Sequence, residues 1–455
     1  AKKALDIGII DQIVENVVEN SIDFIIHLVD MCERMGMKFS EMDHPKVRDK
    51  NEKMLDVTLA HSSLILGHNH PRLSNAIKNQ IDKGSAFTNI TEPAIELSEI
   101  MSKTIPCAEK IRLVNSGTEA SILATRIVRA YTGKNLILKF EGAYHGFADN
   151  LLFNTNYGNS NNWKNYPIPT PDSIGIPKSL CNDILIAPYN DLDKTQSIIL
   201  NNKENIAGII IEPVMRGLET DKSFIKGIKN ISLKENIPLI FDEVITGFRL
   251  SLGGAQEFFG ITPDISIYGK ALGAGYPIGA IAGNKKIMNL LDPISTDENR
   301  IFSIGSFHSN PISSTAALMC IKELQNPQNY ITLNKFGDDL RSGLSQIFSQ
   351  YKIPHFITGS GSIVEFFFTS NPISNYRDTL KTNLNLKSLL SIELPKNFIV
   401  GGGGRYTSSI FHKEKELSWL LEGINNSLNE INASGELEKS YERNQSSLAS
   451  ATKMG

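Results

Sequence analysis

The strongest constraint on the fold is a series of short β-branched segments that alternate with helical stretches from about residue 95 onward. The segments span residues 111–114, 135–140, 183–188, 206–213, 237–244 and 264–269, after a predicted helix at 94–104. Strands that alternate with helices in this way form a parallel or mixed sheet covered by helices on both faces. The sequence therefore predicts an α/β fold.

A chain of 455 residues is too long for one small core. Changes in the sequence pattern divide it into five predicted regions. We predict an N-terminal helical extension (1–40), the N-terminal part of a small domain (41–93), a large domain (94–325), the C-terminal part of the small domain (326–433) and a polar tail (434–455). The tail is rich in Ser, and we expect it to fray.

Two segments differ from their surroundings. Residues 9–36 carry apolar side chains at helical spacing with an acidic opposite face, which indicates a helix that either packs on the body or docks a partner. Residues 150–178 are rich in Asn, Pro and Gly and show no period. We interpret them as an active-site loop, with a disordered insert as the alternative.

Composition narrows the function classes. The net charge of −3 does not indicate a nucleic acid or an anionic membrane as partner. No apolar run approaches the roughly 20 residues of a membrane span. The four Cys form no CxxC pair and the nine His form no HxH or HExxH pair, so we predict neither a disulfide framework nor a metal site. We expect a cytoplasmic protein.

The turn NSGTEA (115–120) follows a predicted strand and opens a predicted helix. Gly117 lets the backbone approach a ligand, and Ser116 and Thr118 offer hydroxyls. The free N–H groups at a helix start suit a phosphate, although such a turn is also an ordinary helix cap.

Two further candidates lie at predicted strand ends. Asp242 ends an apolar strand, where a buried acid needs a partner such as a pyridinium nitrogen, or else caps a neighbouring loop. Lys270 lies beside Gly269 in a Gly-lined turn, so we expect a desolvated amine with a lowered pKa that can form a Schiff base. Open α/β sheets bind ligands at strand ends, so the motifs together indicate one site.

Six motifs in the same order resemble the class III aminotransferases. They are NSGTEA, FEGAYHG (140–146), IIEPV (210–214), FDEVITGFR (241–249), YGKALGAGYPIGA (268–280) and GSFHSNP (305–311). The most similar subgroup is that of glutamate-1-semialdehyde 2,1-aminomutase and the β-amino-acid aminotransferases. The resemblance implies fold-type I, with a large domain whose mostly parallel sheet is sandwiched by helices, and a smaller α+β domain.

The resemblance also implies roles for single residues. Lys270 would carry pyridoxal 5'-phosphate as a Schiff base and shuttle a proton, Asp242 would pair with the pyridine nitrogen, and Tyr144 would stack on the ring. Further cofactor contacts are implied at Ser116, Gly117, Thr118, His145, Glu212, Val244 and Ser306. In this family the Ser306 position reaches the phosphate from the neighbouring subunit, which implies a homodimer with shared active sites.

The substrate side departs from the family pattern. The Ser-Pro-Arg segment of the aminomutases is missing, and Gly404 and Arg405 stand near the position of a glutamate that the family usually has. Arg405 and Arg216 are candidates for binding a substrate carboxylate, with a solvent-facing side chain as the alternative for each. For Arg249 we expect a structural ion pair behind the site.

We therefore predict a transaminase that moves an amino group from a small-molecule donor to a keto or aldehyde acceptor through Lys270 and pyridoxamine phosphate. The alternative is an intramolecular aminomutase of the glutamate-1-semialdehyde type, with residues 150–178 as a lid. A third hypothesis is a cofactor-binding protein without transaminase activity. The helix at 9–36 also allows a carrier protein that delivers a tethered substrate.

Overall fold

The computed structural model describes residues 53–155, 167–294, 300–401 and 404–453. The predicted helix at 9–36 and residues 156–166 of the predicted active-site loop lie outside the described residues, so both stay predictions. Within the described ranges, no helix is both long enough and apolar enough to cross a membrane.

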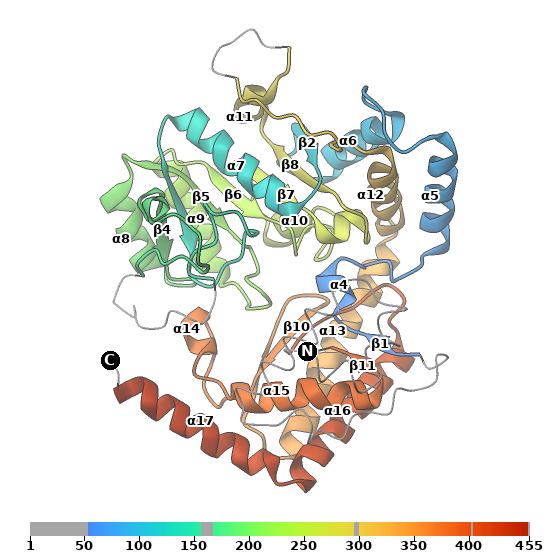
Figure 1. The fold of residues 1–455 in the computed structure, drawn as a ribbon, viewed down its shortest axis with the longest axis vertical. Coiled ribbons are helices and arrows are strands. Elements are labelled where there is room, and N and C mark those ends of the chain that lie inside the picture. Colours follow the sequence, from blue (N-terminus) through green and yellow to red (C-terminus); the bar gives the residue numbers. More distant parts are fainter. Residues whose placement is uncertain (1–52, 156–166, 295–299, 402–403, 454–455) are drawn as a thin grey trace. The chain divides into compact units, whose positions relative to one another are not determined.

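A seven-stranded sheet forms the centre of the fold, in the order β2-β8-β7-β6-β5-β3-β4 (Figure 1). The strands are β2 (Lys110–Val114), β3 (Leu136–Phe140), β4 (Ile184–Ala187), β5 (Ile206–Ile211), β6 (Leu239–Asp242), β7 (Ile265–Tyr268) and β8 (Gly279–Gly283). Within this sheet β8 runs antiparallel to β2 and β7, and the remaining pairs are parallel. The mixed α/β sheet and all six predicted strands are confirmed.

Strand β8 was not among the predicted strands. Its sequence, GAIAG, is built from residues with low β-propensity, so it carries no local strand signal. The small residues have a structural reason, because a Cβ on Gly279 would lie 2.3 Å from the carbonyl oxygen of Ser116. The strand therefore fits closely against the turn that follows β2.

Helices cover both faces of the sheet. In β5, Ile210 packs with α7 (Gly117–Thr132), whereas Ile209 and Ile211 pack with α8 (Leu192–Asn202) and α9 (Lys222–Lys234). This division follows from strand geometry, since successive side chains point to opposite faces. Burial on both faces explains why every residue of this strand is apolar or Gly, four of the six being Ile.

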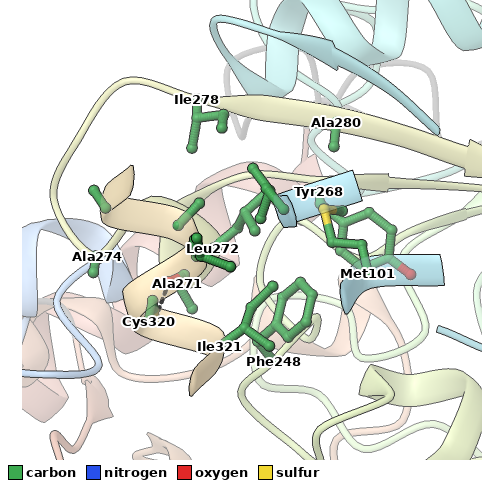
Figure 2. Close-up of a cluster of buried hydrophobic side chains, with 14 of the residues drawn as sticks. Met101, Phe248, Tyr268, Ala271, Leu272, Ala274, Ile278, Ala280, Cys320 and Ile321 are labelled. Atoms are coloured by element: carbon green, nitrogen blue, oxygen red, sulfur yellow. Dashed lines mark hydrogen bonds between the residues drawn. The ribbon is translucent and has the colours of Figure 1, made fainter. Parts of the chain in front are cut away.

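A further helical layer supports the turn η4 (Lys270–Gly273). It consists of α5 (Pro71–Lys83), α6 (Glu92–Thr104) and α12 (Pro311–Leu324), and α12 contacts α5, α6 and η4. Figure 2 shows Ala271 and Leu272 packed beside Ile321 and Cys320, whose thiol donates to the carbonyl of Ala271 at 3.1 Å. The residues directly after Lys270 are thereby fixed in a core.

The C-terminal part of the chain contains a three-stranded antiparallel sheet, in the order β12-β10-β9, together with several helices. Its elements are α13 (Pro327–Gln350), β9 (Phe356–Thr358), β10 (Ile363–Phe367), α14 (Tyr376–Thr379), α15 (Leu384–Glu393), η6 (Leu394–Asn397), β11 (Ile399–Val400), β12 (Arg405–Thr407) and α16 (Glu414–Ala433). Strand β1 (Leu55–Asp56) pairs with β11, so an N-terminal segment joins this part. Short elements elsewhere are α4 (Leu59–Ser62), η3 (Lys178–Asp183), α10 (Gly254–Phe259), α11 (Lys285–Met288) and η5 (Asn289–Leu291).

The expectation that the polar tail frays is wrong. Residues Glu436–Lys453 form helix α17, which contacts α15 and α16. The side chain of Ser440 is buried and accepts a hydrogen bond from Asn383 at 3.1 Å. Gly435, in the left-handed region at φ 74°, lets the chain turn between α16 and α17. The predicted boundaries between the other regions stay predictions.

Candidate active site

The predicted site residues lie where neighbouring parallel strands end. Glu212 follows β5, Asp242 is the last residue of β6, and Lys270 follows β7 after Gly269. Because these strands are adjacent and parallel, their ends meet at one edge of the sheet. Strand β2 runs in the same direction, so the start of α7 at Gly117 lies at that edge as well.

Glycines bring the N-terminus of α7 close to the neighbouring strand ends. A Cβ on Gly117 would lie 2.9 Å from Cγ2 of Val244, and a Cβ on Gly269 would lie 3.5 Å from the amide nitrogen of Gly117. Ser116 caps the helix, its hydroxyl accepting from the amide of Glu119 at 3.2 Å. The partial positive charge and free amides of this 16-residue helix suit a phosphate.

The loop with Tyr144 and His145 lies against this helix start. A Cβ on Gly146 would lie 2.5 Å from Oγ1 of Thr118. The amide of Tyr144 donates to Oε1 of the buried Glu212 at 2.7 Å. Tyr144 is 43% exposed, so its side chain is accessible to a ligand.

Asp242 is held by two donors. Its Oδ2 lies 2.6 Å from Nδ1 of His145, and its Oδ1 accepts from the amide of Val244 at 3.0 Å. Both side chains are almost fully buried. Since a carboxylate can only accept, Nδ1 of His145 carries the proton, and the buried Nε2 has no partner among the described residues. The carboxylate keeps acceptor capacity for one further donor.

Lys270 has a strained backbone and a perturbed amine. Its φ of 43° lies in the left-handed region, which the buried residues after it enforce. Burial lowers the pKa of Lys270, and the charges of Arg405 and Arg216 add to that effect, while the carboxylates of Asp242 and Glu212 oppose it. A lowered pKa makes the unprotonated amine, which is the nucleophile for a carbonyl carbon, more accessible.

The charges of both candidate arginines act on this amine and lower its pKa. Arg216 occupies a left-handed turn, with Cζ 6.0 Å from the centroid of the Tyr144 ring. Arg405 begins β12, and its Nη1 is buried without a hydrogen-bond partner among the described residues. A buried guanidinium nitrogen without an acceptor is costly, and an incoming carboxylate would supply one.

Ser306 lies in a segment that contacts the start of α7, because Nε2 of His308 lies 3.2 Å from Oε2 of Glu119 in the first turn of that helix. Ser306 is exposed, in the segment before α12. Arg249 is fully buried and donates to the backbone carbonyls of Ser408 and Ser62, each at 2.9 Å. The predicted ion pair of Arg249 is therefore wrong: within the described residues its partners are carbonyls and a hydroxyl, which distribute the charge without a carboxylate.

The sequence analysis missed Lys139, a charged residue inside an apolar strand. Its side chain is fully buried in β3, and Nζ donates to the carbonyls of Ala143 and Leu151 at 3.0 Å, and also to that of Phe153. Burial lowers its pKa to about 7. These bonds hold both ends of the loop that carries Tyr144 and His145. A lysine amid apolar strand residues was the available signal.

Comparisons with known proteins agree on one family. The model of the family "Aminotransferase class-III" matches residues 35–394. A curated glutamate-1-semialdehyde 2,1-aminomutase of Fusobacterium nucleatum is 38% identical over 384 residues, which cover 83% of this chain and 86% of that protein. A solved omega-transaminase from Sphaerobacter thermophilus is 29% identical, with a TM-score of 0.78, over 83% of this chain and 86% of that one. A solved transaminase with bound PLP is 27% identical, with a TM-score of 0.76, over 84% of this chain and 88% of that one.

Proposed function

The chain belongs to the class-III aminotransferase family, and on that premise we propose that it is a transaminase whose amino donor carries a carboxylate. The fold is fold-type I and the cofactor is pyridoxal 5'-phosphate, as the family and the similar PLP-bound transaminase have it. The acceptor would be a keto acid or an aldehyde.

The described residues fit this cofactor. Its phosphate suits the start of α7, where Ser116, Gly117 and Thr118 offer amides and hydroxyls. A pyridinium N–H suits the carboxylate of Asp242, which retains acceptor capacity beside His145. When bound, the cofactor supplies an electron sink for the carbon that bears the amine.

Lys270 would move the proton. Its desolvated Nζ would hold the cofactor at the carbonyl carbon, with the carbonyl oxygen leaving as water. Once the amine of the donor has displaced Nζ from that carbon, the freed Lys270 amine would take the proton from Cα of the donor and deliver it on the cofactor side. The accessible side chain of Tyr144 would cover the cofactor ring on one side, with Val244 packed near Gly117.

The main support for a donor with a carboxylate is the buried Nη1 of Arg405, which has no hydrogen-bond partner among the described residues. A donor screen that follows the absorbance of the cofactor, repeated with Arg405→Gln, tests it. The substitution should raise KM about 10- to 100-fold for donors with a carboxylate and leave carboxylate-free amines such as 1-phenylethylamine unchanged. Equal KM values in both proteins, or no reaction with any donor, would overturn the proposal.

An aminomutase is a second candidate, favoured by the name of the 38% identical relative. The missing Ser-Pro-Arg segment and the Gly404-Arg405 pair in place of the usual glutamate weigh against it. An aminomutase converts one substrate without an external donor or acceptor. Net isomerisation of glutamate-1-semialdehyde by the holoenzyme alone would decide for this candidate.

A homodimer with shared sites is part of the proposal. The side chains of Phe302, Ile304 and Phe307 around Ser306 are 72%, 76% and 64% exposed in the single chain. Large apolar side chains gathered on a surface support an interface. Light scattering should give twice the chain mass, and Ser306→Ala should weaken cofactor binding. A fully active monomer would contradict this part.

A further inference from the structure

Glu365 and Arg405 lie directly opposite each other across β10 and β12, but they do not form an ion pair within the described residues. Opposite residues of antiparallel strands share a face, with Cβ atoms about 5 Å apart, so opposite charges at such positions normally attract. Instead, Oε1 of Glu365 accepts from Nζ of Lys387 at 2.8 Å. Nη1 of Arg405 stays buried and unpartnered.

The Lys387–Glu365 pair is closely enclosed. The two side chains are 13% and 9% exposed. Gly404, at φ 83°, makes room for the lysine, because a Cβ there would lie 2.3 Å from Cε of Lys387. The ammonium also lies 4.6 Å from the centroid of the Phe367 ring, within cation–π range.

The same glutamate supports the second candidate arginine. A Cβ on Gly217 would lie 2.8 Å from Cβ of Glu365, so the turn that carries Arg216 rests directly on the glutamate. Glu365 therefore lies between the arginine turn and β12, where its charge could neutralise a guanidinium. Instead, the ammonium of Lys387 pairs with the carboxylate of Glu365.

We propose that Lys387 is a specificity-determining positioning residue, which holds the carboxylate of Glu365 and thereby keeps Arg405 free for the carboxylate of the substrate. This inference rests on the role proposed above for Arg405. Without the ammonium, Glu365 would be a buried carboxylate without a partner, a costly state. The guanidinium across the strand pair would relieve it, and a substrate carboxylate would then have to displace Glu365.

Lys387→Met tests this idea in the holoenzyme, since it removes the charge and keeps the length of the side chain. We expect KM for alanine as donor to rise about tenfold with little change in kcat, and Kd for propionate, an unreactive carboxylate, to rise equally. The double variant Lys387→Met/Glu365→Gln should return both constants to within about threefold of the wild type. Lys439→Met, which breaks a pair with Glu436 in α17, is the matched control and should leave them unchanged.

The outcomes separate this inference from the proposed function. If Arg405→Gln weakens propionate binding and Lys387→Met does not, the role of Lys387 is overturned and the role of Arg405 stands. If Arg405→Gln has no effect on propionate binding, the proposed substrate class is overturned, whatever Lys387→Met does. A general packing defect would persist in the double variant, and this also contradicts the inference. Should Lys387→Met not fold, a raised KM in Glu365→Gln alone would overturn it.

Discussion

Nδ1 of His145 lies 2.6 Å from Oδ2 of Asp242, although the two residues are 97 positions apart in the chain. Both side chains are almost fully buried. The bond joins the loop of Tyr144 to the end of β6, so the orientation of the carboxylate and that of the ring-covering loop depend on each other. An imidazole that donates to a buried carboxylate also satisfies part of the hydrogen-bonding capacity of that carboxylate.

Asp242→Asn should retain part of the cofactor binding and lose about 100- to 1000-fold in kcat, because an amide cannot stabilise a protonated pyridine nitrogen as a carboxylate does. Single-turnover kinetics with saturating cofactor measure this. His145→Leu, which leaves Asp242 in place, should cost only about tenfold. A normal turnover number for Asp242→Asn would contradict the proposed role.

Lys270→Ala removes the buried amine that follows β7. It should therefore abolish the visible absorbance of the bound cofactor and reduce transamination at least about a thousandfold. Absorbance spectra and a donor half-reaction test this in one sample. Lys439→Ala, at an exposed helix position, is the control and should behave as wild type. Survival of both signals in Lys270→Ala would mean that another group binds the carbonyl carbon.

Lys139→Met should lower the free energy of unfolding by about 2–4 kcal/mol, because three buried carbonyls lose their hydrogen-bond donor. It should also weaken cofactor binding, since the Tyr144 loop loses its support. Denaturant titration and a cofactor titration measure the two effects. Lys134→Met removes a bond to only one carbonyl, that of Lys203, and should cost about 1 kcal/mol. Equal losses in the two variants would argue against a special role of Lys139.

His412 should make the fold sensitive to acid. Burial lowers its pKa to about 4 in the folded chain, below the ordinary value of 6.5. Above pH 6.5 the imidazole is neutral in both states and contributes nothing. Between pH 6.5 and 4 the unfolded chain binds the proton and the folded chain does not, so stability falls as pH falls. From pH 7.5 to 5 the loss should be about 2 kcal/mol.

Denaturant unfolding at a fixed protein concentration checks this pH dependence. His412→Asn should lose about 2 kcal/mol less than the wild type between the two pH values, whatever its stability at neutral pH. The exposed His61 is the control position, and His61→Asn should keep the wild-type slope. An unchanged slope in His412→Asn would show that other groups cause the acid sensitivity.

Much of the fold follows from local patterns. Strands β5, β6 and β7 are buried on both faces, a requirement that a short apolar run expresses directly, and the other three predicted strands are also rich in apolar residues. Strand β8 could not be predicted, since its Gly and Ala residues are selected by the close approach of Ser116 and not by strand propensity. The tail helix α17 was missed because its stability depends on contacts with α15 and α16.

The sequence by itself determined the family, the central α/β sheet and the order of the motifs around Lys270, Asp242 and the turn at Gly117. Those signals are local, because each depends on a few adjacent residues at a strand end. Only the tertiary structure decided which charges meet. The pairing of Glu365 with Lys387, the unpartnered nitrogen of Arg405 and the contact of His145 with Asp242 each join separate elements. Electrostatic interactions depend on distance in space, which the spacing of residues along a chain does not specify.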